Sequence, residues 1–392
     1  MSKKELGIYI HIPFCKQKCY YCDFISFANK NKKVDEYIQA IKSEINCHNF
    51  KDYNVTTIYI GGGTPSYIDS KYIVEILKQL KKKVIEECNK KFDEIEVTIE
   101  VNPGTVDREK LQQFKENGVN RLSIGLQSTK DRLLKEIGRI HTYNDFLETY
   151  KVAGEVGFDN INVDLMLGLP NQSLGDLKES IDEIIKLNPN HISVYSLIVE
   201  EGTLIANLLE EGKLKLPSED LERNMYWYIK NRLELQGYKH YEISNFAKIG
   251  KESKHNMNCW EQKDYIGIGL AAHSYLNGIR YSNTTDLEEY IENMEMLENP
   301  MNEILKESKI YEIHERQSTD DMKKEYMLIG LRKIDGIEIR KFKEKFGDNP
   351  IFIFRKELER LSSEGLIQID GDYIRLSNKG LDFANEVWEE FV

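Results

Sequence analysis

Short apolar runs alternate with longer amphipathic stretches along the first 240 residues. The amphipathic stretches, of which 34–45 (VDEYIQAIKSEI) and 71–88 (KYIVEILKQLKKKVIEEC) are the clearest, place apolar residues near i, i+3, i+4 and i+7, as a helix with one buried face does. The short runs have the composition of β-strands, and six are predicted to be strands: Ile8–Ile12, Thr56–Gly62, Glu94–Val101, Arg121–Gln127, Ile161–Leu169 and His191–Ile198.

Six strand–helix units in series predict an α/β fold with a parallel sheet and helices packed outside it. A dinucleotide-type GxGxxG motif does not follow the first strand, which disfavours the open sheet of a dinucleotide-binding fold. We therefore expect residues 1–240 to form a partial, TIM-like (β/α)6 barrel. Ligands of such barrels bind at the carboxyl ends of the strands, so the loops that follow the strands are the place to look for chemistry.

The periodicity changes after about residue 240. Residues 241–319 have several glycines and no clear period, and are expected to form a loop-rich connecting region. Residues 320–392 read as a separate small α+β domain, with a helix followed by a hairpin that turns at Asp370–Gly371–Asp372. This pattern resembles a winged helix. Acidic residues outnumber basic ones in it, so we expect a structural or docking role and not a DNA-reading one.

Composition narrows the class of protein. The chain has 392 residues, of which 40% are hydrophobic and 31% charged, as in ordinary globular proteins. Its formal charge of −12 argues against a nucleic-acid partner. No signal peptide is evident, and no apolar stretch approaches the roughly 20 residues that a membrane span requires. We expect a cytoplasmic protein without a membrane span, whose oligomeric state the sequence does not indicate.

Half of the six cysteines lie in one short segment, HIPFCKQKCYYCDF, which follows the first predicted strand. One interpretation is a structural zinc site, but zinc prefers four ligands, usually from two separated pairs. Three closely spaced thiolates suit a [4Fe–4S] cluster better, because each cysteine binds one iron and the fourth iron stays open to another ligand. The expected cluster ligands are Cys15, Cys19 and Cys22.

Other predicted strands also end in residues suited to binding. The second is followed by GGGTPS (61–66), where glycines let the backbone approach a ligand closely, although a tight strand–helix turn would explain the same letters. Further polar residues occur in or after buried runs, at Glu100, Gln127, Arg139 and Asp164. A buried carboxylate is costly unless it finds a partner, which is either a ligand or another side chain across the barrel mouth.

Taken together, these motifs resemble the radical S-adenosylmethionine (SAM) superfamily, and within it the oxygen-independent coproporphyrinogen III oxidase-like family. The resemblance rests on HIPFCxxxCxYCDF, GGGTPS, TIEVNPGT, RLSIGLQS, NVDLMLGLP, HNMNCW and GIGLAAHSY, and runs from Tyr9 to about Tyr275. It implies a [4Fe–4S] cluster whose open iron is chelated by SAM. The positions that match the family's SAM contacts are Tyr9, Tyr21, Gly62, Gly63, Thr64, Glu100, Gln127, Arg139 and Asp164.

The family contains oxidases that decarboxylate coproporphyrinogen and a heme chaperone that carries heme. The oxidases have a further cysteine where this chain has Phe24, and they extend further upstream of the first strand; both differences favour the chaperone. The chaperone branch has an HNxxYW motif that corresponds to His255–Trp260 here, with Cys259 in place of tyrosine. The resemblance thus implies heme contacts from His255, Cys259 and Trp260.

A chaperone of this kind would bind heme as its cargo and deliver it to an apo-hemoprotein, expected to be membrane-associated. The alternatives are a coproporphyrinogen III oxidase of porphyrin biosynthesis, and another radical SAM enzyme acting on a tetrapyrrole. The sequence therefore leaves open whether the chain is an enzyme, and identifies no catalytic residue.

Overall fold

A computed structural model describes residues 3–295 and 311–392 of the chain. Its main feature is a curved sheet of 12 strands in the order β14-β13-β12-β11-β1-β4-β5-β6-β7-β8-β10-β9. The six predicted strands are neighbours in this sheet and all run parallel. Their bounds are β1 (Lys4–Ile12), β4 (Tyr53–Gly62), β5 (Glu96–Val101), β6 (Arg121–Gln127), β7 (Ile161–Leu167) and β8 (His191–Ser196). The α/β partial barrel is confirmed, and its two edge strands, β14 and β9, are not paired with each other.

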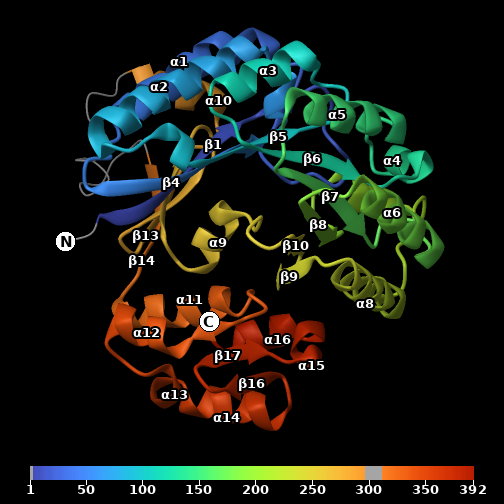
Figure 1. Ribbon diagram of the computed structural model, residues 1–392, viewed down its shortest axis with the longest axis vertical. Helices are drawn as coiled ribbons and strands as arrows, with labels where there is room; N and C mark the ends of the chain where they lie inside the picture. The colour runs from blue at the N-terminus through green and yellow to red at the C-terminus, as the bar shows by residue number, and fades with distance from the viewer. Residues whose placement is uncertain (1–2, 296–310) are drawn as a thin grey trace.

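Helices cover the convex face of the sheet (Figure 1). Their apolar faces explain why: α2 buries Ile73, Ile76, Leu77, Leu80 and Val84, which follow one side of the helix. Capping boxes begin α5, α6 and α11. None of the described helices combines the length and apolar character that crossing a membrane requires. The helices before residue 295 are α1 (Val34–Cys47), α2 (Ser70–Cys88), α3 (Arg108–Glu116), α4 (Asp131–Glu136), α5 (Tyr143–Val156), α6 (Leu174–Leu187), α7 (Leu204–Glu210), α8 (Glu219–Leu235), α9 (Lys254–Trp260) and α10 (Leu287–Glu295).

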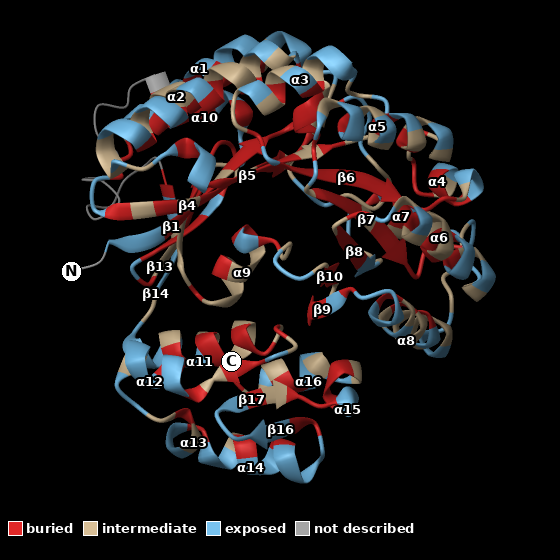
Figure 2. Cartoon of the chain, in the orientation of Figure 1, coloured by how far each residue is buried: buried red, intermediate tan, exposed pale blue. Residues whose placement is uncertain are grey.

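The two faces of the parallel strands differ in polarity, because successive side chains of a strand point to opposite faces. In β6, Leu122, Ile124 and Leu126 belong to the apolar core under the helices. The alternate residues Ser123 and Gln127 line a pocket on the concave side. Figure 2 shows that most residues of the parallel strands are buried, so the concave side of the barrel is an interior with polar walls.

The region that the sequence predicts as loop-rich contains more regular structure than expected. It has β10 (Asn245–Ala247), α9, β11 (Asp264–Ile268), β12 (His273–Leu276), β13 (Ile279–Asn283), α10 and β14 (Tyr311–Arg316); β9 (Lys239–Glu242) precedes them, and residues 296–310 lie outside the described residues. β11 pairs in parallel with β1 and extends the sheet beyond the six predicted strands. The following turn is tight, since a Cβ on Gly267 would lie 2.2 Å from the carbonyl oxygen of His273. The boundaries at 240 and 319 stay a prediction.

The C-terminal part forms its own apolar core, which includes Phe342, Leu358, Leu361, Ile374 and Val387. Its small antiparallel sheet has the order β15-β17-β16, and the predicted hairpin turns at Gly371 with a φ of 57°. The winged-helix-like α+β architecture is therefore confirmed. Its elements are α11 (Thr319–Gly330), β15 (Ile337–Glu338), α12 (Ile339–Phe346), α13 (Pro350–Ile353), α14 (Arg355–Ser363), β16 (Ile367–Asp370), β17 (Tyr373–Leu376), α15 (Asn378–Asp382) and α16 (Ala384–Glu389).

This part faces the concave side of the sheet, with α9 between them (Figure 1). α9 contacts β4 and β11 on one side and α11 on the other. The guanidinium of Arg332 lies over the rings of Trp260 and Trp388, at 4.4 and 5.1 Å from their centroids. A cation between two aromatic rings stabilises such a contact. α9 is thus held by both the barrel and the C-terminal part.

Candidate functional site: a cysteine-lined pocket at the barrel mouth

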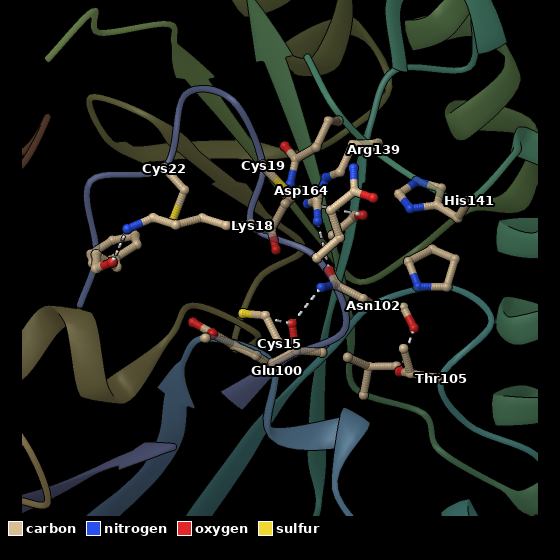
Figure 3. Close-up of a pocket in the computed structure, with 18 of the residues that line it drawn as sticks. Cys15, Lys18, Cys19, Cys22, Glu100, Asn102, Thr105, Arg139, His141 and Asp164 are labelled. Carbon is tan, nitrogen blue, oxygen red and sulfur yellow. Dashed lines mark hydrogen bonds between the residues drawn. The ribbon is translucent and has the colours of Figure 1, made fainter. Parts of the chain in front are cut away.

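The three clustered cysteines lie on one loop at the carboxyl end of β1. Cys15 is in the short strand β2 (Phe14–Cys15), which pairs with β3 (Phe27–Ala28), and its side chain is buried. Cys19 and Cys22 are half-buried further along the loop. The amide of Tyr20 donates to the carbonyl of Ile137 at 3.0 Å, so the loop is attached to the segment after α4. Figure 3 shows the three thiols around a space that Glu100, Arg139 and Asp164 also border.

The surroundings of Cys15 and Cys22 favour the protonated form of both thiols when no metal is bound. Burial raises the pKa of Cys15, against a 3.6 Å hydrogen bond from the hydroxyl of Thr64, and burial with the nearby Cys19 thiol raises the pKa of Cys22. Bound iron would remove this preference, because thiolates are its ligands. Gly63 leaves room beside the loop, since a Cβ there would lie 2.9 Å from the sulfur of Cys15.

The three cysteines of this loop are a donor set that fits an iron–sulfur cluster. Within residues 3–295 and 311–392, no group of three or more His, Cys, Asp or Glu side chains is placed to hold one metal ion. A [4Fe–4S] cube takes three thiolates by giving each its own iron. The residues present therefore fit a cube bound by three cysteines.

The cysteines border a pocket of about 430 Å³ at the carboxyl ends of the strands. Eight of the nine positions predicted to contact SAM line it: Tyr21, Gly62, Gly63, Thr64, Glu100, Gln127, Arg139 and Asp164. The ninth, Tyr9, does not; its hydroxyl is 2.9 Å from Nδ1 of His11 and its ring stacks on Tyr59. The pocket thus gathers most of the predicted residues, and their roles as SAM contacts stay a prediction.

Sequence reasoning missed several residues that also line the pocket, among them Asn102, Ser123, His141 and Tyr195. Asn102 follows Glu100 by two positions, so the period of the strand placed it on the same face. It accepts a hydrogen bond of 3.0 Å from Nη1 of Arg139 and donates one of 2.9 Å to the hydroxyl of Thr64. Asn102 therefore orients two residues of the site. No comparable signal marked His141.

The pocket holds half-buried groups of both charges. Burial, together with the charge of Asp164, raises the pKa of Glu100 to about 7. Burial also raises the pKa of Asp164, although Asn162 and Ser123 donate hydrogen bonds to it. Arg139 lies across the same pocket. Two carboxylates and a guanidinium suit a ligand that has both a cationic group and a carboxylate. Each charged side chain would then face an opposite charge, which offsets the hydration that it has lost.

The residues predicted to contact heme lie elsewhere, on α9 at the amino ends of the strands. His255 is buried, with Nδ1 2.9 Å from the hydroxyl of Thr57 and its ring 5.2 Å from that of Tyr59. Burial, and then the charge of Arg121, lower its pKa to about 4. Burial raises the pKa of Cys259 to about 11. None of these residues lines the pocket, although Tyr59, against which His255 packs, does, and their role in heme binding stays a prediction.

A parallel partial barrel with three cysteines at its mouth defines a protein of the radical SAM class. Comparison with known families agrees: residues 9–184 match the model of the radical SAM superfamily, and 317–383 that of the HemN C-terminal domain. Proteins of this superfamily bind a [4Fe–4S] cluster and SAM.

The full-length relatives are more specific. The chain is 38% identical to the heme chaperone HemW of Bacillus subtilis over 98% of both chains, and 35% identical to that of Lactococcus lactis over 100% of this chain and 98% of the relative. The chain therefore belongs to the HemW family. Coproporphyrinogen III oxidase (HemN) from Escherichia coli has the same fold, with a TM-score of 0.82 at 22% identity over 99% of this chain and 90% of the enzyme.

Proposed function

We propose that this protein is a heme chaperone, which binds heme and passes it to an apo-hemoprotein acceptor. The observation that carries the proposal is the 38% identity, over 98% of both chains, to a protein named heme chaperone HemW. Phe24 supports it, because this residue replaces the cysteine expected of the oxidases and lies 61% exposed at the edge of the pocket.

In this proposal Cys15, Cys19 and Cys22 bind the cluster and the pocket beside them receives SAM. The cluster would supply electron transfer, and the residues of the pocket would bind and orient SAM. Arg139 is held by Asn102 and by the carbonyl of Gly125, so its charge has a defined position for an anionic group. The backbone amide of Gly62 donates a hydrogen bond to Glu100. This bond gives the carboxylate a defined position for a cationic group of the ligand.

We propose that heme is bound through His255, with Cys259 and Trp260 beside it. The low pKa of His255 keeps the imidazole neutral at pH 7, which is the form that coordinates iron. The ring is buried against Thr57 and Tyr59, so heme binding requires α9 to move away from the barrel interior. The hydrogen bond to Thr57 and the packing on Tyr59 oppose that movement until heme offers a stronger bond.

The experiment that tests this function uses anaerobically reconstituted, reduced protein with SAM and either heme or coproporphyrinogen III. Heme binding is followed by the Soret band, and porphyrin products and 5′-deoxyadenosine by chromatography. We expect stoichiometric heme binding, transfer to an added apo-hemoprotein, and no decarboxylated product. Catalytic formation of protoporphyrinogen would refute the proposal and make the protein an oxidase.

A further inference from the structure

A line of hydrogen-bonded side chains crosses the barrel interior from the pocket to α9. Asp164, in the pocket, accepts from the amide of Asn162 at 2.7 Å. The carbonyl oxygen of that amide lies 2.6 Å from Nδ1 of His191, whose Nε2 lies 2.7 Å from the hydroxyl of Tyr241. The same hydroxyl accepts from the backbone N–H of Ser253 at 3.2 Å. These five residues, which we name the lumen chain, connect the pocket to the N-cap of α9.

The donors of the lumen chain all point the same way. Burial lowers the pKa of His191 well below its usual value, so the ring is neutral and carries one N–H. That N–H is on Nδ1, because the oxygen of Asn162 only accepts. Nε2 must then accept from Tyr241, and Tyr241 accepts from Ser253. Every donor is therefore directed toward the carboxylate of Asp164, and bonds aligned in this way strengthen one another.

The two ends of the lumen chain contact the pocket and α9, whereas its middle members are buried between them. Asp164 is the end that a ligand in the pocket can reach. Ser253 is the N-cap of α9, and its hydroxyl accepts from the amide of Asn256. The members between them are buried, with exposed fractions of 2% for Asn162, 0% for His191 and 3% for Tyr241. A continuous line of buried hydrogen bonds therefore joins Asp164 to the start of α9.

We propose that the lumen chain couples occupancy of the pocket to the release of α9, with Asn162, His191 and Tyr241 as positioning residues. A ligand group that donates a hydrogen bond to Asp164 competes with Asn162, weakens the bonds behind it, and loosens the hold on Ser253. His255 then leaves Thr57 more easily. SAM should accordingly raise the affinity for heme, and heme must raise the affinity for SAM by the same factor. The loss of one net hydrogen bond predicts a factor of roughly five.

This inference rests on the proposed function for its heme-binding readout, but its test has an independent one. Tyr241→Phe removes the hydroxyl that joins His191 to Ser253. Tyr238→Phe is a matched control, because Tyr238 is equally buried and its hydroxyl donates only to the carbonyl of Pro189, at 2.7 Å. His191→Phe interrupts the chain one link nearer to Asp164, in case Tyr241→Phe does not fold.

Two quantities are measured on the full-length protein carrying its cluster: heme affinity with and without SAM, and hydrogen–deuterium exchange of the α9 amides with and without SAM. We expect SAM to tighten heme binding about five-fold and to speed α9 exchange in the wild type and Tyr238→Phe. Neither effect should remain in Tyr241→Phe, whose α9 should already exchange fast.

The possible failures are distinct. If the wild type binds no heme, the proposed function is wrong, while the exchange of α9 still tests the lumen chain. If SAM leaves α9 exchange unchanged in the wild type, or changes it equally in Tyr241→Phe and Tyr238→Phe, the lumen chain carries no coupling and the inference is wrong.

Discussion

Glu100 should make the stability of the ligand-free protein depend on pH in an unusual direction. Its carboxylate accepts hydrogen bonds from the hydroxyl of Tyr59 and the amide of Gly62, yet burial and the nearby charge of Asp164 raise its pKa to about 7 from 4.5. Those two hydrogen bonds therefore do not offset the free-energy cost of ionising Glu100 in its half-buried position. A ligand with a cationic group would supply the opposite charge that stabilises the ionised carboxylate.

The size and sign of the effect follow from proton binding. Between pH 4.5 and about 7, an unfolded glutamate is ionised while Glu100 in the folded protein keeps its proton. The folded state binds more protons in this window, so the free energy of unfolding falls as the pH rises. The full difference between the two pKa values corresponds to about 3 kcal/mol. Water in the open pocket screens the carboxylate, and we expect about half of that.

Glu100→Gln removes the ionisation and should abolish this loss. Without ligand, the wild type should lose about 1.5 kcal/mol of its free energy of unfolding between pH 5 and pH 8 through Glu100, and the variant should not. Urea unfolding at a series of pH values measures this difference. Glu109→Gln, at an exposed position of α3, is the control and should follow the wild type. Parallel pH profiles for the wild type and Glu100→Gln would show that the reasoning about burial is wrong.

Three further results are expected. Replacing the three clustered cysteines by serine should eliminate bound iron and the brown absorbance after anaerobic reconstitution, and an unchanged iron content would contradict the cluster assignment. His255→Ala should weaken heme binding by at least about ten-fold in Soret titrations and leave the cluster intact, whereas His273→Ala, on an exposed position of β12, should not. Glu44→Gln should lower the free energy of unfolding by about 2 kcal/mol in urea, because the buried Glu44 carboxylate accepts from the amide of Gly269 and the hydroxyl of Tyr290, and an unchanged midpoint would refute this.

The parallel strands were predictable because each alternates apolar and polar residues within a short run. The prediction for Arg121–Gln127 matches β6 at both ends, and the others differ by a few residues. The same alternation places Glu100 of β5 and Asp164 of β7 in one pocket, since both point to the inward face of the sheet, on the two strands that flank β6. Local pattern therefore carried most of the information about the barrel and its mouth.

The remaining structure depends on pairings between distant segments. β11 has five residues and no period that distinguishes it from a loop, and it becomes a strand only by pairing with β1. The position of α9 is likewise set from a distance: the carboxylate of Glu96, in β5, accepts from the backbone amides of Lys254 and His255. Nothing in the residues near His255 indicates a partner more than 150 positions away.

The polar interior is what makes a buried His255 compatible with a role in iron binding. Barrels of this type usually fill their interior with branched apolar layers, whereas here the interior carries Arg121, which is 2% exposed and whose Nε has no hydrogen-bond partner among the described residues. A buried charge is costly, and Arg121 lowers the pKa of His255 further than burial alone. Burial is the main reason that the imidazole stays unprotonated, and the charge of Arg121 adds to it. In the proposed function, α9 is held over the barrel by the hydrogen bonds of its first turn and carries a neutral imidazole, which is the form that coordinates iron.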